Sequence, residues 1–166
     1  MIRGDGPSPA PLGSCDRMRG AKTFLIAVLL AAVLVAAVSV TASASSSNEM
    51  RRKLLSLTNS ARNNNGMRPL DLNWRLSEDA LRHSRRMANE RSIFHTANLY
   101  RIVRQWHPTV WGENVGMAGT VSRVQRMFMT SSAHRGNILR GNYSKVGIGV
   151  LRRGGDIWTT VVFYGR

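Results

Sequence analysis

The stretch KVGIGVLRRGGDIWTTVVFY, residues 145–164, indicates how the rest of the chain must pack around it. Alternating apolar residues over Lys145–Val150 and an apolar run over Ile157–Tyr164 flank Gly154-Gly155, which predicts a β-hairpin. One face of the second strand carries Ile157, Thr159, Val161 and Phe163, and the other carries Trp158, Thr160, Val162 and Tyr164. Because both faces are largely apolar, we expect this strand to be covered on both sides.

Three helices are predicted upstream of the hairpin, because apolar residues recur there at spacings of three and four. A capping box over residues 46–49 is expected to open the first helix, and residues 63–66 (NNNG) are expected to end it. Ser77 is the predicted N-cap of the second helix, and the third is expected to start near Thr120. Helices on both sides of an antiparallel sheet make this an α+β fold.

The first 44 residues are predicted to lie outside the fold. Residues 24–38 are all apolar, basic residues precede them, and Ala42-Ser43-Ala44 follows them. This order is typical of a secretory signal peptide, and the basic stretch suggests that translation starts at Met18. The alternative is an uncleaved membrane anchor over residues 24–40. A membrane-spanning helix needs about 20 apolar residues, which favours cleavage and secretion.

Export would leave one domain over residues 45–166. The whole chain has 24 Lys+Arg, 9 Asp+Glu and a net charge of +15; removing four basic and two acidic residues leaves the domain at +13. The single cysteine, Cys15, is removed too, so no disulfide framework or cysteine zinc site is expected. A domain of this size can be stable through core packing alone.

Two stretches of the domain have the composition of a functional site. In residues 111–116 (WGENVG), Glu113 stands among glycine and apolar residues without a basic neighbour in sequence. Such a carboxylate is either paired in space or shifted in pKa. In residues 131–139 (SSAHRGNIL), His134 lies at the predicted end of the third helix.

Several pieces of the sequence, in order, resemble the CAP superfamily, which groups cysteine-rich secretory, antigen 5 and pathogenesis-related proteins. The resemblance is to its bacterial secreted (SCP-like) form and covers residues 52–165. The matching pieces are Leu57-Thr58-Asn59-Ser60-Ala61-Arg62, Leu81-x-His83-Ser84-x-x-Met87-Ala88, Phe94-His95-Thr96, Gly112-Glu113-Asn114-Val115, Ser131-x-x-His134-Arg135-x-Asn137-Ile138-Leu139, Tyr143, Val146–Val150 and Trp158-Thr159-Thr160-x-x-Phe163.

The resemblance implies a three-layer α-β-α sandwich with a small antiparallel sheet and a shallow cavity. In animal members two histidines and two acids line that cavity. His95 and His134 correspond to the histidines and Glu113 to one acid, whereas Ser131 stands where the other acid is expected. The resemblance therefore predicts a cavity with an incomplete set of these side chains.

The cavity residues leave three functions open. His95, Glu113 and His134 can hold Zn²⁺ or another divalent cation, or a small ligand, which makes the protein an extracellular binding module, the interpretation we favour. The same residues would permit metal-assisted hydrolysis, with Glu113 or a metal-bound water as the base. Alternatively, they only bond to one another and hold residues 97–110 against the sheet. Ser131 and His134 resemble a nucleophile and its base, but a local capping role for Ser131 is favoured.

The other histidines are not expected to act chemically. His83 lies beside the apolar stripe of the second helix and is predicted to be partly buried with its hydrogen bonds satisfied. His107 precedes Pro108 in a predicted loop and is expected to be exposed.

Arginines suggest a further class of partner. They gather on the predicted solvent side of the second helix and recur beyond it, at Arg75, Arg82, Arg85, Arg86, Arg101, Arg104, Arg123 and Arg126. On an exported protein such a surface would meet anionic cell-wall polymers or lipid headgroups. Specific nucleic-acid binding is not expected, since no groove-reading motif is present.

Overall fold

The computed structural model describes residues 46–166. The predictions for the signal segment, including the start at Met18 and the apolar residues 24–40, lie outside the described residues. Ser43–Arg166 forms one compact unit. Within the described part of the chain, no helix has the length and apolar character that crossing a membrane requires.

A sheet of four strands forms the centre of the domain, in the order β1-β3-β4-β2. The strands are β1 (Asp71–Leu72), β2 (Val110–Ala118), β3 (Lys145–Arg153) and β4 (Asp156–Gly165). The β3–β4 pair is the predicted hairpin, and β2 pairs antiparallel with the other side of β4. The sheet is not wholly antiparallel as predicted, because the two-residue β1 runs parallel to β3.

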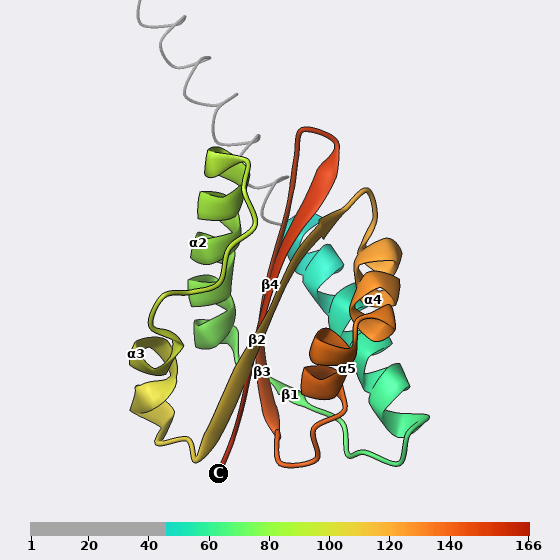
Figure 1. Cartoon of the computed structure of the whole chain (residues 1–166), viewed down its shortest axis with the longest axis vertical. Coiled ribbons are helices and arrows are strands. Elements are labelled where there is room, and N and C mark those ends of the chain that lie inside the picture. The colour runs from blue at the N-terminus through green and yellow to red at the C-terminus, as the bar shows by residue number, and fades with distance from the viewer. Residues whose placement is uncertain (1–45) are drawn as a thin grey trace, which may run out of the picture. The chain divides into compact units, whose positions relative to one another are not determined.

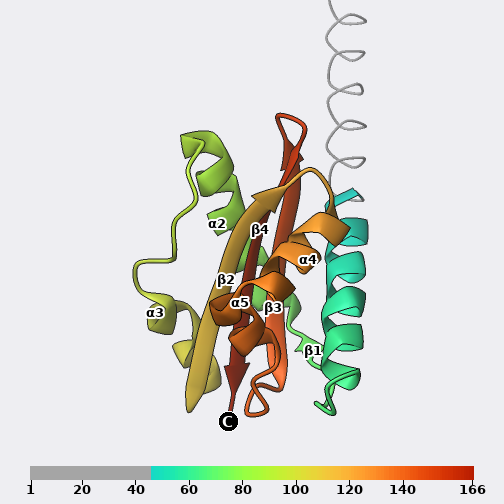
Figure 2. The ribbon, with the colours of Figure 1, turned by 45° about the vertical axis from the view of Figure 1, so that its right-hand side comes forward.

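Helices cover both faces of this sheet (Figures 1 and 2). On one face lie α2 (Trp74–Glu90) and α3 (Leu99–Val103), which continues into the 3-10 helix η1 (Arg104–Trp106). On the other face lie a helix over residues 46–63, here called the first helix, α4 (Val121–Thr130) and α5 (Ser132–Ile138). The predicted three-layer α-β-α architecture is confirmed.

The β4 strand confirms the prediction of a strand covered on both faces, since every residue from Ile157 to Gly165 is buried. Ile157, Val161 and Phe163 join the core cluster beneath the first helix and α4. Val162 and Tyr164 pack with residues of α2 and η1 on the opposite face. A Cβ at Gly149 of β3 would collide with the backbone of α2, so this glycine lets α2 approach the sheet closely.

The helix ends confirm some of the predicted signals and correct others. Thr120 caps α4 as expected, and Gly66 follows the first helix with φ +73°. The predicted N-cap of α2 at Ser77 is wrong: Asn73 is extended, its side chain accepts from the N–H of Leu76, and the helix starts at Trp74. Ser77 Oγ instead donates to Asn73 O and accepts from the N–H of Ile148 on β3. Ser46 is itself helical, so it does not cap the first helix.

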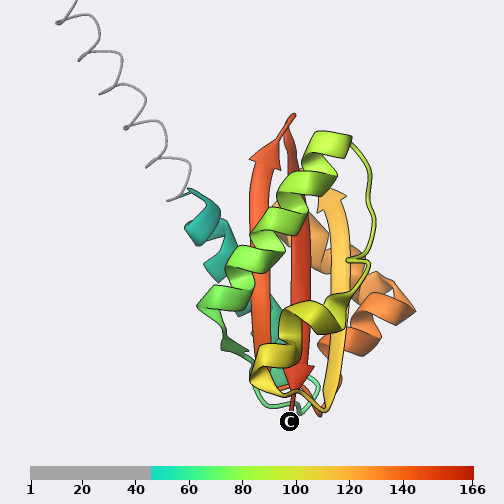
Figure 3. The same cartoon turned by 90° about the vertical axis from the view of Figure 1, so that its left-hand side faces the viewer.

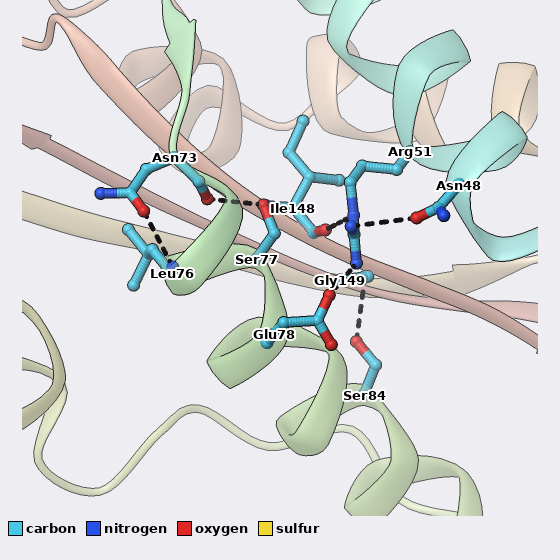
Figure 4. Close-up of polar contacts among 9 residues, drawn as sticks. All are labelled: Asn48, Arg51, Asn73, Leu76, Ser77, Glu78, Ser84, Ile148 and Gly149. Atoms are coloured by element: carbon cyan, nitrogen blue, oxygen red, sulfur yellow. Dashed lines mark hydrogen bonds and ion pairs between the residues drawn. The ribbon is translucent and has the colours of Figure 1, made fainter. Parts of the chain in front are cut away.

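Two arginines of the first helix are buried, which the sequence analysis did not predict. Arg51, 2% exposed, donates through Nε to the Ile148 carbonyl at 2.7 Å and through Nη2 to Glu78 Oε1 at 3.0 Å. A third bond joins Nη1 to Asn48 on its own helix. Figure 4 shows this guanidinium reaching from the first helix to β3 and α2.

Arg62, which is fully buried, bonds only to backbone carbonyls. Its guanidinium donates to Arg68 O and Ile138 O, both at 2.7 Å, to Arg140 O at 3.0 Å and to Tyr143 O at 3.2 Å. Arg68 follows the turn after the first helix, Ile138 is the last residue of α5, and Arg140 and Tyr143 lie between α5 and β3. Burial lowers the pKa of the Arg62 guanidinium, but carbonyl oxygens on all its nitrogens compensate for the lost hydration.

Candidate functional site

The candidate site is built on β2, the strand at the sheet edge opposite β1. Glu113 and Asn114 lie next to each other on this strand, so their side chains point to opposite faces of the sheet. Glu113 faces α2 and the segment that follows it, and Asn114 faces α5. The strand therefore links groups from both outer layers.

The Glu113 carboxylate is 3% exposed and accepts three hydrogen bonds. The backbone N–H of Thr96 donates to Oε2 at 2.9 Å, and the Thr96 hydroxyl donates to Oε1 at 2.6 Å. His95 Nδ1 lies 2.8 Å from Oε2. The structure thus brings His95 and Glu113 together, and both carboxylate oxygens are engaged. We call His95, Thr96 and Glu113 the clamp.

His95 differs from its partner in exposure, because 62% of its side chain is accessible to solvent. A carboxylate that accepts from Nδ1 fixes the proton on that nitrogen, which leaves the Nε2 lone pair free. This is the arrangement in which a histidine acts as a metal ligand with a carboxylate behind it. Glu113 is therefore placed to orient His95, and each of its oxygens accepts at least one hydrogen bond within the clamp.

His134 comes from the opposite layer. Its backbone carbonyl accepts from Asn114 Nδ2 at 3.0 Å, and Asn137 of the same helix donates to the Glu113 carbonyl at 3.1 Å. These bonds attach α5 to the edge of β2. The imidazole packs on the Phe128 ring at 5.0 Å, and its Nδ1 is buried without a partner within residues 46–166. Burial lowers the pKa of His134, and the charge of His95 lowers it further.

Ser131 acts as the N-cap of α5. Its Oγ accepts from the backbone N–H of His134 at 3.5 Å, as the capping interpretation predicted. The described residues show no bond between this hydroxyl and the His134 imidazole. A correction concerns the helix itself: α4 ends at Thr130, so His134 lies in a separate short helix and not at the end of α4.

His83 of α2 is a neighbour of the clamp that the sequence analysis set aside. It is 5% exposed, its Nδ1 lies 3.1 Å from Thr160 Oγ1, and its ring packs edge-on against Phe94 at 5.2 Å. Burial lowers the pKa of His83, whereas the charge of Glu113 raises it. Its Nε2 is buried without a partner in the described chain, so the prediction of a satisfied side chain is wrong. His107 is exposed as expected.

A cavity of 270 Å³ lies against the clamp on the α2 side. It is lined by Asp79, Arg82, His83, Arg86, Thr96 and Ile102. The predicted cavity residues do not line it; only Thr96, which bonds to Glu113, and His83 connect it to the clamp. The signal that could have indicated His83 is its place in the matching piece Leu81-x-His83-Ser84.

The three predicted ligands differ in how far their donor atoms are already hydrogen-bonded. No group of three or more His, Cys, Asp or Glu side chains among residues 46–166 is arranged to hold a metal ion. Thr96 and His95 bond to both Glu113 oxygens, whereas the imidazoles of His95 and His134 each keep a ring nitrogen without a bond to the residues described. We therefore treat Glu113 as the residue that positions His95.

Comparison with known proteins gives one family. The profile of the cysteine-rich secretory protein family, CAP, matches residues 55–163. The uncharacterized protein YkwD of Bacillus subtilis (strain 168) is 30% identical over 127 residues, which cover 72% of this chain and 49% of YkwD. The chain thus spans about half the length of this relative.

Solved structures share the fold. An extracellular protein of Bacillus anthracis that contains an SCP domain aligns with TM-score 0.64 and 20% identity, over 72% of this chain and 41% of that protein. An outer surface protein of Borrelia burgdorferi aligns with TM-score 0.64 and 20% identity, over 71% of this chain and 93% of that protein.

Proposed function

The chain belongs to the cysteine-rich secretory protein (CAP) family, and from this premise we propose that it is an exported binding module whose clamp presents His95 to a divalent metal ion or small ligand. Export is supported by the apolar residues 24–38 behind a basic stretch and by relatives described as extracellular or outer-surface proteins. Cell fractionation of the tagged full-length chain tests it; retention in the cytoplasm would contradict it.

The binding proposal rests on a difference in solvent exposure between the two partners of one hydrogen bond, Glu113 and His95. Glu113 is 3% exposed and His95 62%, although their side chains are 2.8 Å apart. A hydrogen bond made only for stability would gain little from an imidazole left mostly in water. A buried carboxylate that fixes an exposed imidazole instead prepares Nε2 to bind.

His134 supplies the second donor in this proposal. Its lowered pKa keeps the imidazole neutral at neutral pH, which is the protonation state that metal binding requires. Zn²⁺ is among the ions that imidazole ligands suit, and a bound Zn²⁺ would supply a Lewis acid with open positions for water or ligand. A site with two protein donors is expected to bind less tightly than a complete structural zinc site.

The clamp argues against the hydrolase alternative in which Glu113 is the base. A general base must reach the proton that it removes, but the Glu113 side chain is 3% exposed and its three hydrogen bonds hold it against His95 and Thr96. Binding is therefore the function that we propose, and hydrolysis with a metal-bound water as the base is the alternative.

Zinc titration of the compact unit Ser43–Arg166 tests the proposal. We expect Zn²⁺ to raise the melting temperature near neutral pH and to do so less at acid pH, where histidines are protonated. The double variant His95→Ala/His134→Ala should lose this effect, while His107→Ala, an exposed histidine outside the clamp, should keep it. Unchanged zinc affinity in the double variant would disprove the site.

A further inference from the structure

A second cavity lies at the end of the domain where the β3–β4 turn, the C-terminus of α2 and the end of β2 meet (Figures 1 and 3). Its volume is 540 Å³, within the range of roughly 300–1,000 Å³ typical of small-molecule sites. We call it the hairpin cavity. None of the clamp residues lines it.

The floor of the hairpin cavity is apolar. It is formed by Ala88, Trp158 and Met117, and the last two are register partners on β4 and β2. The indole N–H of Trp158 donates to the Arg153 carbonyl at 3.3 Å, so the ring offers the cavity an apolar surface. Met117 is 37% exposed, so its side chain adds accessible apolar surface to the lining.

Two exposed arginines stand at the rim, Arg91 and Arg153. Arg91 is the C-cap of α2 and has left-handed backbone angles, φ 50° and ψ 36°. Glycine takes this conformation without strain and is the usual residue at such helix ends, whereas an arginine pays a conformational cost. A strained non-glycine residue beside a cavity points to a use for its side chain.

The charge of the rim favours the binding of an anionic ligand. Neither rim arginine forms an ion pair within the described residues; Arg153 instead bonds to the amide oxygen of Asn89. Asp156 is the one acid in the lining. Two guanidinium groups against one carboxylate leave a positive site, and guanidinium is the side chain best suited to phosphate oxygens.

The beginning of the described chain lies at the same end of the domain. A smaller hollow of 180 Å³ beside the β3 edge is lined by Ser46, Ser47, Met50, Arg85, Leu151 and Arg152. Arg85 and Arg152 thus add positive charge near the turn.

We propose that this end of the domain docks on a membrane surface and that the hairpin cavity takes the headgroup of an anionic phospholipid. The phosphate lies between Arg91 and Arg153, and the glycerol carbons lie on Trp158 and Met117. The proposal is independent of metal binding at the clamp, which lies farther along β2.

Vesicle sedimentation of Ser43–Arg166, the unit that holds the whole core, tests the proposal. Binding is expected to phosphatidylcholine vesicles that contain phosphatidylglycerol, to be absent with phosphatidylcholine alone, and to weaken with salt. The variant Arg91→Gly/Arg153→Gln should bind about 25-fold more weakly, since each basic residue near an anionic surface contributes about fivefold. Its melting temperature should hold, because glycine suits the left-handed position.

A matched variant separates the cavity from diffuse charge. Arg68→Gln/Arg101→Gln removes the same charge from exposed positions outside the hairpin cavity and should leave binding within about twofold. Equal losses in the two variants would overturn the proposal. Titration by NMR with soluble short-chain phosphatidylglycerol should shift the amides of Met117 and Gly154. Equal shifts at equal concentrations of inorganic phosphate would show an anion site without a lipid partner and would also overturn it.

Discussion

Buried charge occurs in two regions of this domain, and they differ in what they leave unbound. Arg62 is buried completely, and backbone carbonyls accept from each of its nitrogens. Glu113 is buried almost as deeply, but its partner His95 keeps a free nitrogen in solvent. In the first region, every guanidinium nitrogen of Arg62 finds its hydrogen-bond acceptor within the fold, and this arrangement contributes to stability. The second holds one group in a fixed orientation for something outside the fold.

The largest effect is expected from Arg62→Met. This change removes the guanidinium donors from four carbonyls, of which Arg140 O keeps the N–H of Tyr143, and breaking such a cluster costs about 3–5 kcal/mol in the free energy of unfolding. Urea unfolding measures it. Arg52→Met, an exposed arginine of the same helix, should change stability by less than about 0.5 kcal/mol. Similar losses in both variants would show that Arg62 acts through helix propensity or net charge and not through its carbonyl partners.

Glu113→Gln should affect function more than stability. The amide keeps the shape of the side chain but replaces one acceptor oxygen with a donor, so the clamp loses at least one hydrogen bond, a cost of about 1–3 kcal/mol. Zinc affinity should fall by about 10- to 100-fold, because His95 loses the partner that orients it. Titration calorimetry measures this change.

Thr96→Val is the matched control for the clamp. It removes the hydroxyl bond to Oε1 and keeps both the backbone N–H bond and the His95 contact. Its stability loss should be comparable, while its zinc affinity should stay within a few-fold of the original protein. If Thr96→Val lowers zinc affinity as much as Glu113→Gln does, the orienting role of Glu113 is wrong.

The same two regions show how far sequence alone could predict this molecule. The hairpin and the helix periodicity are local patterns, so the three layers followed from them. The buried arginines did not, because the partners of Arg62 lie as far as 81 positions along the chain and are backbone atoms without a sequence signature. The resemblance pointed to His95, Glu113 and His134. It could not show that Thr96 donates to both carboxylate oxygens of Glu113.

The smallest effect concerns how the free energy of unfolding depends on pH. Buried histidines near the clamp contribute to this dependence, whereas Arg62 does not. Burial lowers the pKa of both His83 and His134, so below the ordinary histidine pKa of about 6.5 the unfolded chain binds more protons than the folded one. Stability should therefore fall as the pH drops from 7 towards 5, and His134→Gln should make that slope shallower in urea unfolding. Arg62→Met should keep the slope, because an arginine stays charged throughout this range. If the double variant His83→Gln/His134→Gln kept the full pH slope of the original protein, burial would not be what holds these histidines neutral. His134 would then be a poor second donor beside His95.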